Sequence, residues 1–407
     1  MTRHIFKLVW NRKRSTGLIL LEIMICFLVL CGILSAGINL AQCWQQPLGF
    51  DYENVWAVDI AGMNWGAEGD ELKADLRHSA DLLRAVQSLP EVEAAALTFN
   101  TPFSGSTWAD DTWINGERTH FLWSPMSPDL PQVLKLQLAY GRWVNETDNA
   151  LGYRAVVINR SFARAVFGTD DALGKEMPVF DSEGLPATPE ENAEIHRIVG
   201  VVEDIRRQGV VRESRPVMFL PVNLVDGDEQ LSEILVRVHP GATAAFEEKL
   251  VRAMQQVSPQ WTFDTDLLED RRRVQLTNYI TPLLLTAVVA FFLIVMVGLG
   301  LVGVLWLSVA RRTSELGLRR ALGASAVSVR RQILGELWAL TALAVVTGAI
   351  IYLQLPLFGA NFGAGWFVFL GGAALATLVI YGFVTFCGLY PTWLATRNMP
   401  ATALQYE

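Results

Sequence analysis

The sequence predicts an α-helical membrane protein with four transmembrane helices and a large α+β extracytoplasmic domain inserted between helices 1 and 2. Four apolar stretches predict the helices, because about 20 helical residues cross a bilayer core of about 30 Å. The distribution of charge predicts the domain. Residues 44–270 contain 37 acidic and 18 basic residues, whereas the rest of the chain contains 4 acidic and 15 basic residues. This asymmetry is typical of a membrane protein with an acidic domain on one side.

The N-terminal segment, residues 1–16, is basic, and residues 17–43 are expected to form the first transmembrane helix. Its apolar run of about 24 residues is longer than a signal-peptide core of 7–15 residues, so we expect a retained anchor. Glu22 lies near the start of the run, where a carboxylate reaches lipid headgroups; a proton or substrate role is the less favoured alternative. Cys43 is expected to be a free thiol at the membrane boundary, with a bridge between two chains as the alternative.

Residues 44–273 are expected to form the outer domain. A β-α-β pattern lies near each of its ends. The two patterns predict a split α/β subdomain, about 50–100 and 221–268, with a second subdomain, about 101–220, inserted between them. The cysteine positions offer no disulfide framework, so the domain must be stabilised by its own core.

The second apolar segment, residues 274–310, is too long for a simple membrane span. Its 37 uncharged residues would extend about 55 Å as a helix, well beyond a bilayer core. One interpretation is a stalk that projects outward, straight or bent at Pro282. The other is a tilted helix with an apolar interfacial turn. The length of the segment does not distinguish between these two interpretations.

The remaining segments set the orientation. Residues 311–331 form a short loop with six arginines, and residues 332–355 and 362–389 are the third and fourth predicted transmembrane helices. Residues 356–361 between them carry no basic residue, and residues 390–407 form the tail. By the positive-inside rule, both chain ends and the arginine-rich loop are cytoplasmic, and the acidic domain is outside.

Motifs of hydrolases and metal sites are missing from the sequence: it contains no H-E-x-x-H, G-x-S-x-G or C-x-x-C. Residues 168–176 look like a phosphate loop but have five residues between the glycines instead of four. Glu176 also replaces the Ser or Thr that would hold magnesium. We therefore expect no catalytic residue, no cofactor and no metal. Nucleic-acid binding is not expected either, because the basic residues lie beside the membrane.

The stretch A-R-R-T-S-E-L-G-L-R-R-A-L-G-A-S, residues 310–325, is the most specific motif. It predicts a short basic helix ended by Gly323, after which Ser325 caps the next helix. The result would be a helical hairpin against the membrane, able to dock on a cytoplasmic partner. A loop that binds lipid headgroups is the alternative.

This stretch closely resembles the R-R-x-E-I-G-L-R-R-A-L-G-A-S signature of MacB/FtsX-type ABC transporter permeases, with Leu316 in place of the usual Ile. The tail resembles the family's closing P-x-x-x-A-x-R-x-x-P-x-x-A-L-x-x-E. The outer domain is similar to the MacB-like periplasmic core domain at residues 156–159, 167–168, 174–175 and 199–202. The resemblance covers nearly the whole chain, and it implies that the false phosphate loop is a structural turn.

The resemblance implies a permease subunit of the bacterial inner membrane that works by mechanotransmission. A separate ABC ATPase, bound in two copies, would hydrolyse ATP and move the periplasmic domain through residues 268–310, which act as a lever. The other implied partners are membrane lipids, a second permease chain (a second copy or a paralogue) and, for a MacB-like exporter, a periplasmic adaptor with an outer-membrane channel. The cargo would be a drug, a peptide or another periplasmic molecule.

The resemblance also assigns site residues. The ATPase contacts are expected in the coupling hairpin, where the two glycines allow close packing and the turn: Arg311, Arg312, Glu315, Gly317, Arg319, Arg320 and Gly323. The cytoplasmic tail motif consists of Pro391, Ala395, Arg397, Pro400, Leu404 and Glu407.

Three alternatives to a MacB-like exporter remain. A lipoprotein-extracting or wall-hydrolase-regulating permease would use the same mechanics. A membrane sensor that does not transport would need no stoichiometric ATPase. A membrane-anchored hydrolase is disfavoured by the missing catalytic motifs.

Overall fold

The computed structural model describes most of the chain in two compact units. The described residues are 13–64, 67–105, 109–114, 117–145, 147–148, 152–176, 196–209, 214–224, 231–241, 244–311, 325–358 and 365–397. One unit comprises Cys43–Asn278, and the other comprises Met1–Gln42 with Tyr279–Glu407. Each unit is described separately below.

The expected fold class is confirmed, because an α/β domain lies between the first and second of four long apolar helices. The four helices are α2 (Lys13–Gln45), α7 (Leu268–Arg311), α9 (Ala326–Leu357) and α10 (Trp366–Arg397). The domain contains the helices α3 (Gly69–Gln87), α4 (Leu130–Leu134), α5 (Arg160–Phe167) and α6 (Ala244–Val257). Its strands are β1 (Val55–Ala61), β2 (Val92–Thr98), β3 (Ala109–Ile114), β4 (Glu117–Met126), β5 (Leu138–Gly141), β6 (Arg154–Asn159), β7 (His196–Val202), β8 (Val217–Pro221), β9 (Glu233–Val238) and β10 (Thr262–Leu267).

The four long helices are long and apolar enough to cross a membrane. The candidate spans are Gly17–Gln45, Leu268–Leu307, Val327–Leu357 and Trp366–Leu389. Large apolar side chains cover the outward surface of α7; Leu285, Val288 and Phe291 are each more than 60% exposed. Lipid or another apolar surface must cover such side chains, since water does not solvate them favourably.

Helix α7 is continuous over 44 residues and runs through Pro282 without a break. At 1.5 Å per residue its length is about 66 Å, more than a bilayer core with both headgroup regions, about 40–45 Å. A bend at Pro282 that interrupts the helix is therefore excluded. A helix of this length can reach beyond the membrane on at least one side.

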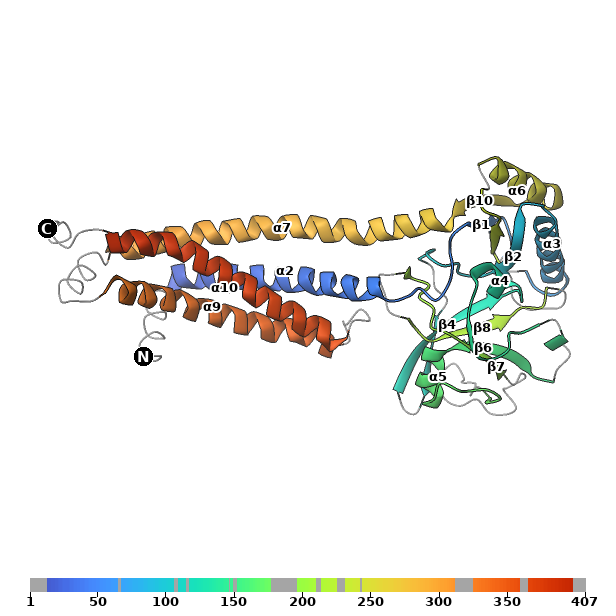
Figure 1. Cartoon of the computed structure of the whole chain (residues 1–407), viewed down its shortest axis with the longest axis horizontal. Helices are drawn as coiled ribbons and strands as arrows, with labels where there is room; N and C mark the ends of the chain where they lie inside the picture. Colours follow the sequence, from blue (N-terminus) through green and yellow to red (C-terminus); the bar gives the residue numbers. More distant parts are fainter. Residues whose placement is uncertain are drawn as a thin grey trace. The chain divides into compact units, whose positions relative to one another are not determined.

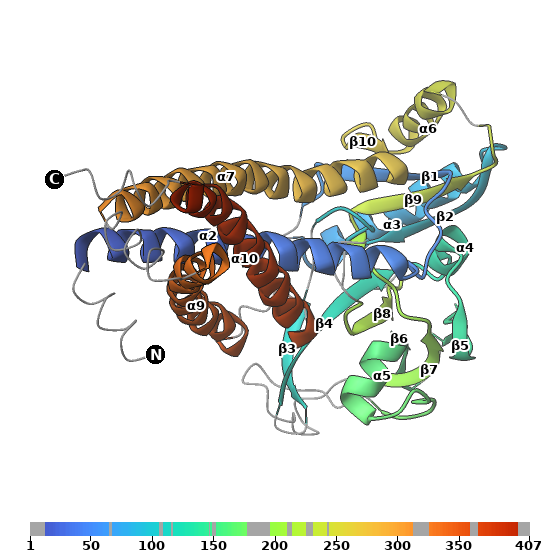
Figure 2. The ribbon, with the colours of Figure 1, turned by 60° about the vertical axis from the view of Figure 1, so that its left-hand side comes forward.

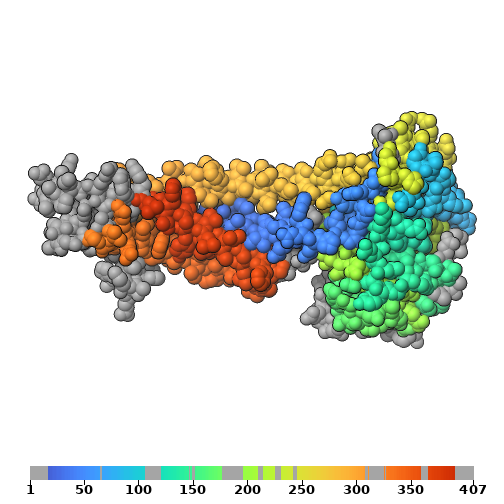
Figure 3. Space-filling model, in the orientation of Figure 1, coloured from blue at the N-terminus to red at the C-terminus, as the bar shows by residue number. Residues whose placement is uncertain are grey.

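Close contacts at small residues hold α2, α9 and α10 together. The Ser35 hydroxyl lies 2.6 Å from the Tyr352 hydroxyl on α9 and donates to the Val368 carbonyl on α10 at 3.2 Å. A Cβ added to Gly372 on α10 would lie 1.9 Å from the Ser35 Oγ. Figure 3 shows the same packing as a continuous surface of the blue α2 and the red α10. The absence of a side chain at Gly372 therefore allows these two helices to touch.

Gly372→Leu is expected to lower the thermal stability of the detergent-solubilised protein by several degrees, because the new side chain must displace α2. Gly382→Leu on the same helix is the matched control, since a Cβ there meets nothing within 4 Å. Thermal unfolding of both variants, followed by size-exclusion fluorescence, measures the difference. Equal stability of the two variants would contradict this account of the packing.

The described strands of the outer domain form one ten-stranded sheet in the order β10-β1-β9-β2-β4-β8-β6-β7-β5, with β3 paired to β4 beside this path. Helices α3 and α6 lie against the part of the sheet that contains β1, β2 and β9, and α5 lies against β6 and β8 (Figures 1 and 2). The strands and helices of the two predicted β-α-β units are therefore present in the structure. The sequence patterns did not predict that both predicted subdomains share a single sheet.

The two faces of the sheet have different cores. On one face, a single core runs under nearly the whole sheet and includes Ala57, Leu134, Val157 and Phe219. The other face has two separate cores. One lies beneath α3 and α6 around Trp56, and the other lies beneath α5 and has Phe162 as a member. Alternation of side chains along each strand produces this division.

Candidate functional site: the junction between the long helices and the outer domain

The predicted coupling hairpin lies mostly outside the described residues. Arg311 is the last residue of α7. Ser325 caps α9 as predicted, because its Oγ accepts a hydrogen bond from the Ser328 N–H at 3.3 Å. The hairpin residues that lie outside the described part are Arg312, Glu315, Gly317, Arg319, Arg320 and Gly323.

The tail motif is described only in part. Pro391, Ala395 and Arg397 lie in the last turns of α10. Pro400, Leu404 and Glu407 lie outside the described residues. The structure therefore brings none of the predicted cytoplasmic residues together in a described site.

The false phosphate loop is a structural turn. Gly168 ends α5 in the left-handed conformation, with φ of 66°, and its N–H donates to the Arg164 carbonyl. The Gly174 N–H donates to the Ile198 carbonyl on β7 at 2.8 Å, which fixes the turn to the sheet. Both glycines thus serve the fold, and their own N–H groups, which a phosphate loop would offer to its ligand, are bonded within the domain.

The junction where α2 and α7 meet the outer domain contains a set of arginines that sequence reasoning did not single out. Arg206, between β7 and β8, is 3% exposed. Its guanidinium donates to the carbonyls of Cys43 at 2.5 Å and Gln46 at 3.4 Å. Cys43 lies in the last turn of α2 and Gln46 directly follows the helix, so Arg206 caps α2 and places a positive charge at its negative end.

Arg271 attaches the first turn of α7 to the sheet. Its guanidinium donates to Asp59 on β1 at 2.7 Å, lies 3.4 Å from the Asp266 carboxylate on β10, and donates to the Thr101 hydroxyl at 3.0 Å. The Thr101 N–H in turn donates to Glu233 on β9. Burial, together with the charge of Asp59, raises the pKa of Glu233 above its ordinary value. The start of α7 is thereby linked to three neighbouring strands.

Arg272 connects the end of α2 with the start of α7. Its guanidinium carbon lies 6.0 Å from the ring centre of Trp44, in the last turn of α2, and 4.8 Å from that of Tyr52. It also donates to the Tyr52 hydroxyl. Cation–π contacts of this kind stabilise by about 0.5–2 kcal/mol. The last turn of α2 and the first turn of α7 are therefore tied to each other within the outer-domain unit.

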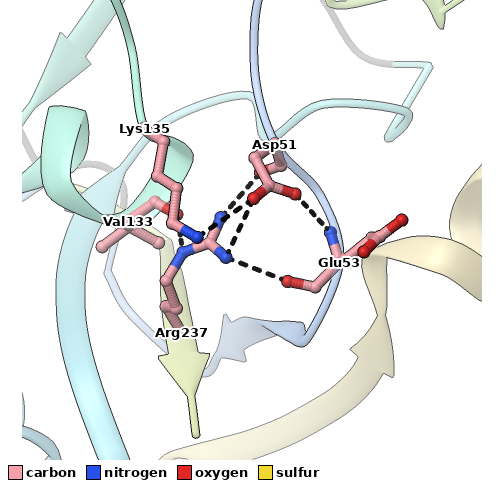
Figure 4. A network of polar contacts seen from close by, with 5 residues as sticks. All are labelled: Asp51, Glu53, Val133, Lys135 and Arg237. Atoms are coloured by element: carbon pink, nitrogen blue, oxygen red, sulfur yellow. Dashed lines mark hydrogen bonds and ion pairs between the residues drawn. The ribbon is translucent and has the colours of Figure 1, made fainter. Parts of the chain in front are cut away.

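Arg237, on β9, is the most deeply buried member of this set, with 2% exposure. Its Nε donates to the Val133 carbonyl at the end of α4 at 2.6 Å. Its terminal nitrogens donate to the carbonyls of Asp51 at 3.0 Å and Glu53 at 3.1 Å, and one of them lies 3.4 Å from the Asp51 carboxylate. Figure 4 shows the guanidinium between these three segments. Arg237 thus fixes the chain that leaves α2 to both β9 and α4.

The Asp51 carboxylate completes this network. Partial burial alone would raise its pKa. The Glu53 N–H, the Lys135 ammonium at 3.2 Å and the charge of Arg237 outweigh burial and lower the pKa below its ordinary value. The carboxylate therefore stabilises the folded domain above its unfolded-state pKa, and this stabilisation is lost as the pH falls through the lower folded-state pKa.

The sequence contains a weak signal for this junction. Arg206 belongs to an Arg-Arg pair, and Arg271 and Arg272 belong to a run of three arginines. A charge run is usually solvated, and nothing in its local sequence shows which of its members is buried. Arg237 stands alone among apolar residues of β9, where an alternating pattern would have placed it on the surface.

Comparison with protein families gives two matches. Residues 16–253 match the MacB-like periplasmic core domain, and residues 287–400 match the FtsX-like permease C-terminal region. The first match begins in α2 and the second extends to the end of α10.

Comparison with characterised proteins gives several relatives described as macrolide export ATP-binding/permease protein MacB. The relative from Pasteurella multocida is 26% identical over 361 residues, which cover 86% of this chain and 52% of the relative. The relative from Bdellovibrio bacteriovorus is 23% identical, with 98% of this chain and 60% of the relative covered. This chain therefore spans about half the length of such relatives.

Among solved structures, the periplasmic region of MacB from Actinobacillus actinomycetemcomitans matches 57% of this chain and 97% of its own length. The identity is 15% and the TM-score is 0.36. This structural similarity adds nothing to the family matches.

Proposed function

We propose, from the premise that this chain belongs to the family of MacB/FtsX-type ABC transporter permeases, that it transmits movement from a cytoplasmic ATPase to the outer domain. Membership of the family implies an ABC ATPase as partner. The two matched regions are a periplasmic core domain and a permease region, and we assign ATP hydrolysis to the ATPase partner. The proposal keeps the domain boundaries predicted from the sequence, with residues 44–273 as the outer domain.

The continuity of α7 is the observation that carries the proposal. The helix starts at the arginine contacts with the sheet and ends at Arg311, where the predicted hairpin begins. A single helix without a break can pass displacement along its axis, because each turn is hydrogen-bonded to the next. A cytoplasmic movement at Arg311 would therefore reach Arg271 and Arg272.

The orientation and the partners follow from the same premise. The chain is a multi-pass membrane protein. We place both chain ends in the cytoplasm and the outer domain in the periplasm of a bacterial inner membrane, on the basis of the arginines in the 311–331 loop. A second permease chain would cover the exposed apolar surface of the helices. A MacB-like exporter would add an adaptor and an outer-membrane channel, with a drug or peptide as cargo.

The proposal predicts that the chain copurifies with an ABC ATPase in mild detergent. Replacing Glu315, Arg319 and Arg320 by alanine is expected to reduce the recovered ATPase by at least about tenfold, because charged contacts at a docking surface determine specificity. Quantitative mass spectrometry of the eluate measures the ratio. Copurification of an adaptor would favour the exporter over a lipoprotein-extracting permease.

A triple variant in the outer domain, Arg164→Ala with Glu248→Ala and Arg252→Ala, is the control, because it makes the same change in charge on exposed residues. It should leave the ATPase ratio unchanged. A wild-type chain that recovers no ATPase would favour the non-transporting sensor, and an unchanged ratio in the hairpin variant would exclude this docking surface.

A further inference from the structure

We infer that the outer domain contains a built-in hinge between strands β2 and β4. We define the split half as β10, β1, β9 and β2 with α3 and α6, and the inserted half as β4, β8, β6, β7 and β5 with α5. The seam is the boundary between β2 and β4. The inserted half can rotate about the seam relative to the split half while the strands within each half stay paired.

The seam has the shortest strand pairing along the described sheet path. β2 and β4 share one register pair, Thr98 with Met126, whereas the neighbouring pairings extend from Val92 to Thr98 and from Leu122 to Met126. Two backbone hydrogen bonds flank the pair, from the Ser127 N–H to Leu97 and from the Phe99 N–H to Pro125. Pro125 has no N–H to add another bond.

Side chains replace part of the missing pairing. The Leu97 N–H donates to the Ser127 hydroxyl at 3.0 Å, and the Thr98 hydroxyl donates to the Pro125 carbonyl at 3.2 Å. Such bonds satisfy buried groups without extending the ladder of backbone hydrogen bonds. The two halves are therefore joined at a short segment near the ends of both strands.

Packing supports rotation in one direction. On the face covered by α3, α6 and α5, the core around Trp56 shares no member with the core around Phe162, although Val222, directly after β8, packs in the core around Trp56. On the opposite face, one core continues across the seam. Helix α4 lies on that face, and Arg237 fixes its end to β9. The continuous face acts as the hinge axis, and the divided face can open.

A polar defect lies at the seam. Asn100, two residues after the Thr98 pair, is 3% exposed and has a left-handed backbone, with φ of 64°. Its Nδ2 has no hydrogen-bond partner among the described protein groups. Asn100 lines a cavity of about 10 Å³ with Thr98 and Ser124, which is room for about one water molecule. Opening of the seam therefore breaks no hydrogen bond between this Nδ2 and a described protein group.

Arg271 in the first turn of α7 donates to the hydroxyl of Thr101, the neighbour of Asn100, so the hinge lies beside the proposed lever. Phe50, Ile205 and Arg207 line the same cavity, and all three lie in segments next to the Arg206 cap. Burial lowers the pKa of Arg207 to about 10, which remains well above neutral pH, so its positive charge stays at the seam. Use of the hinge during ATP hydrolysis rests on the proposed function, whereas the existence of the hinge does not.

Hydrogen exchange of the full-length protein in detergent tests the hinge itself. We expect the amides of Phe99 and Ser127 to exchange at least about tenfold faster than those of Leu235 and Val236 on β9, because the seam opens locally while β9 stays paired on both sides. Protection at the seam equal to that of β9 would overturn the inference.

A reversible disulfide provides the matched control. Thr98 and Met126 form a non-hydrogen-bonded pair, in which the Cα atoms are about 4.5 Å apart, within the range for a disulfide. The double variant Thr98→Cys with Met126→Cys should show slow exchange at the seam when oxidised and wild-type exchange when reduced. Fast exchange in the oxidised form would locate the opening elsewhere and overturn the inference.

Spin labels test whether the transporter uses the hinge. Labels at Asp81→Cys on α3 and Ala165→Cys on α5 span the seam, and labels at Asp81→Cys and Gln255→Cys stay within the split half; the native cysteines are replaced by serine. In the complex with the ATPase, ATP should change the first distance and leave the second unchanged. If the bound ATPase hydrolyses ATP and the first distance stays constant, the hinge has no role in coupling. If no ATPase binds, the proposed function fails and the exchange experiment alone decides the hinge.

Discussion

Replacement of Arg237 by leucine is expected to lower the free energy of unfolding of the outer domain by about 3–5 kcal/mol, because three carbonyl acceptors lose their donor and each unsatisfied buried group costs about 1–3 kcal/mol. The guanidinium is 2% exposed and serves the carbonyls of Val133, Asp51 and Glu53. Leucine would leave these acceptors without their donor and the Asp51 carboxylate with Lys135 as its remaining cation. Urea unfolding of the detergent-solubilised protein, followed by tryptophan fluorescence, measures the loss.

Arg252→Leu is the control for this experiment. Arg252 also pairs with a carboxylate, that of Glu248, but both side chains are largely exposed, and surface pairs contribute little. Its unfolding midpoint should lie close to that of the wild type. If Arg237→Leu behaved like the control, the network in Figure 4 would not be what holds the three segments together.

Gly49→Ala is expected to destabilise the junction by about 3–5 kcal/mol, which is the range of severe single substitutions. Gly49 has φ of 79°, and a Cβ there would lie 2.1 Å from the Asp204 carbonyl oxygen. The obstacle is backbone, so the 203–206 segment must move, and Arg206 would lose its place at the end of α2. Chymotrypsin cleavage after Trp44 or Phe50 in the folded protein, together with urea unfolding, measures this effect.

Gly69→Ala separates the steric effect from the backbone effect. Gly69 also has a positive φ, 58°, but a Cβ there meets nothing within 4 Å. The free energy of unfolding of this variant should fall only by the cost of a left-handed backbone at alanine, about 1–2 kcal/mol. Equal losses at Gly49 and Gly69 would show that the close contact with Asp204 has no consequence.

Individual elements of this fold could be predicted from the sequence because each depends on local patterns. The alternation in β1 and the helical spacing of α3 are visible in residues 55–61 and 69–87. Membrane spans are visible because an unbroken run of about 20 apolar residues matches the thickness of a bilayer core. Ser325 followed the rule for helix caps, and its hydrogen bond confirms that prediction.

The single sheet and the arginine junction could not be predicted, because both depend on contacts between distant residues. The seam joins Thr98 to Met126 through two backbone bonds, and no local pattern specifies this pairing. Arg237 interacts with Asp51, 186 residues away in the chain. An arginine is expected at the surface unless its partners are known. The most buried arginine of the junction, Arg237, was therefore the hardest to predict from the sequence.

The uninterrupted α7 also constrains how the length of the chain can change. Each residue of an α-helix adds 1.5 Å and turns the following residues by about 100°, so inserting one residue between Arg272 and Arg311 would change the angular phase of one end against the other. Seven residues restore the phase to within about 20°. Insertions and deletions in this helix are therefore tolerable mainly in multiples of two turns. The number of residues in α7 thus specifies both the distance between its two ends and the rotation of one end relative to the other about the helix axis.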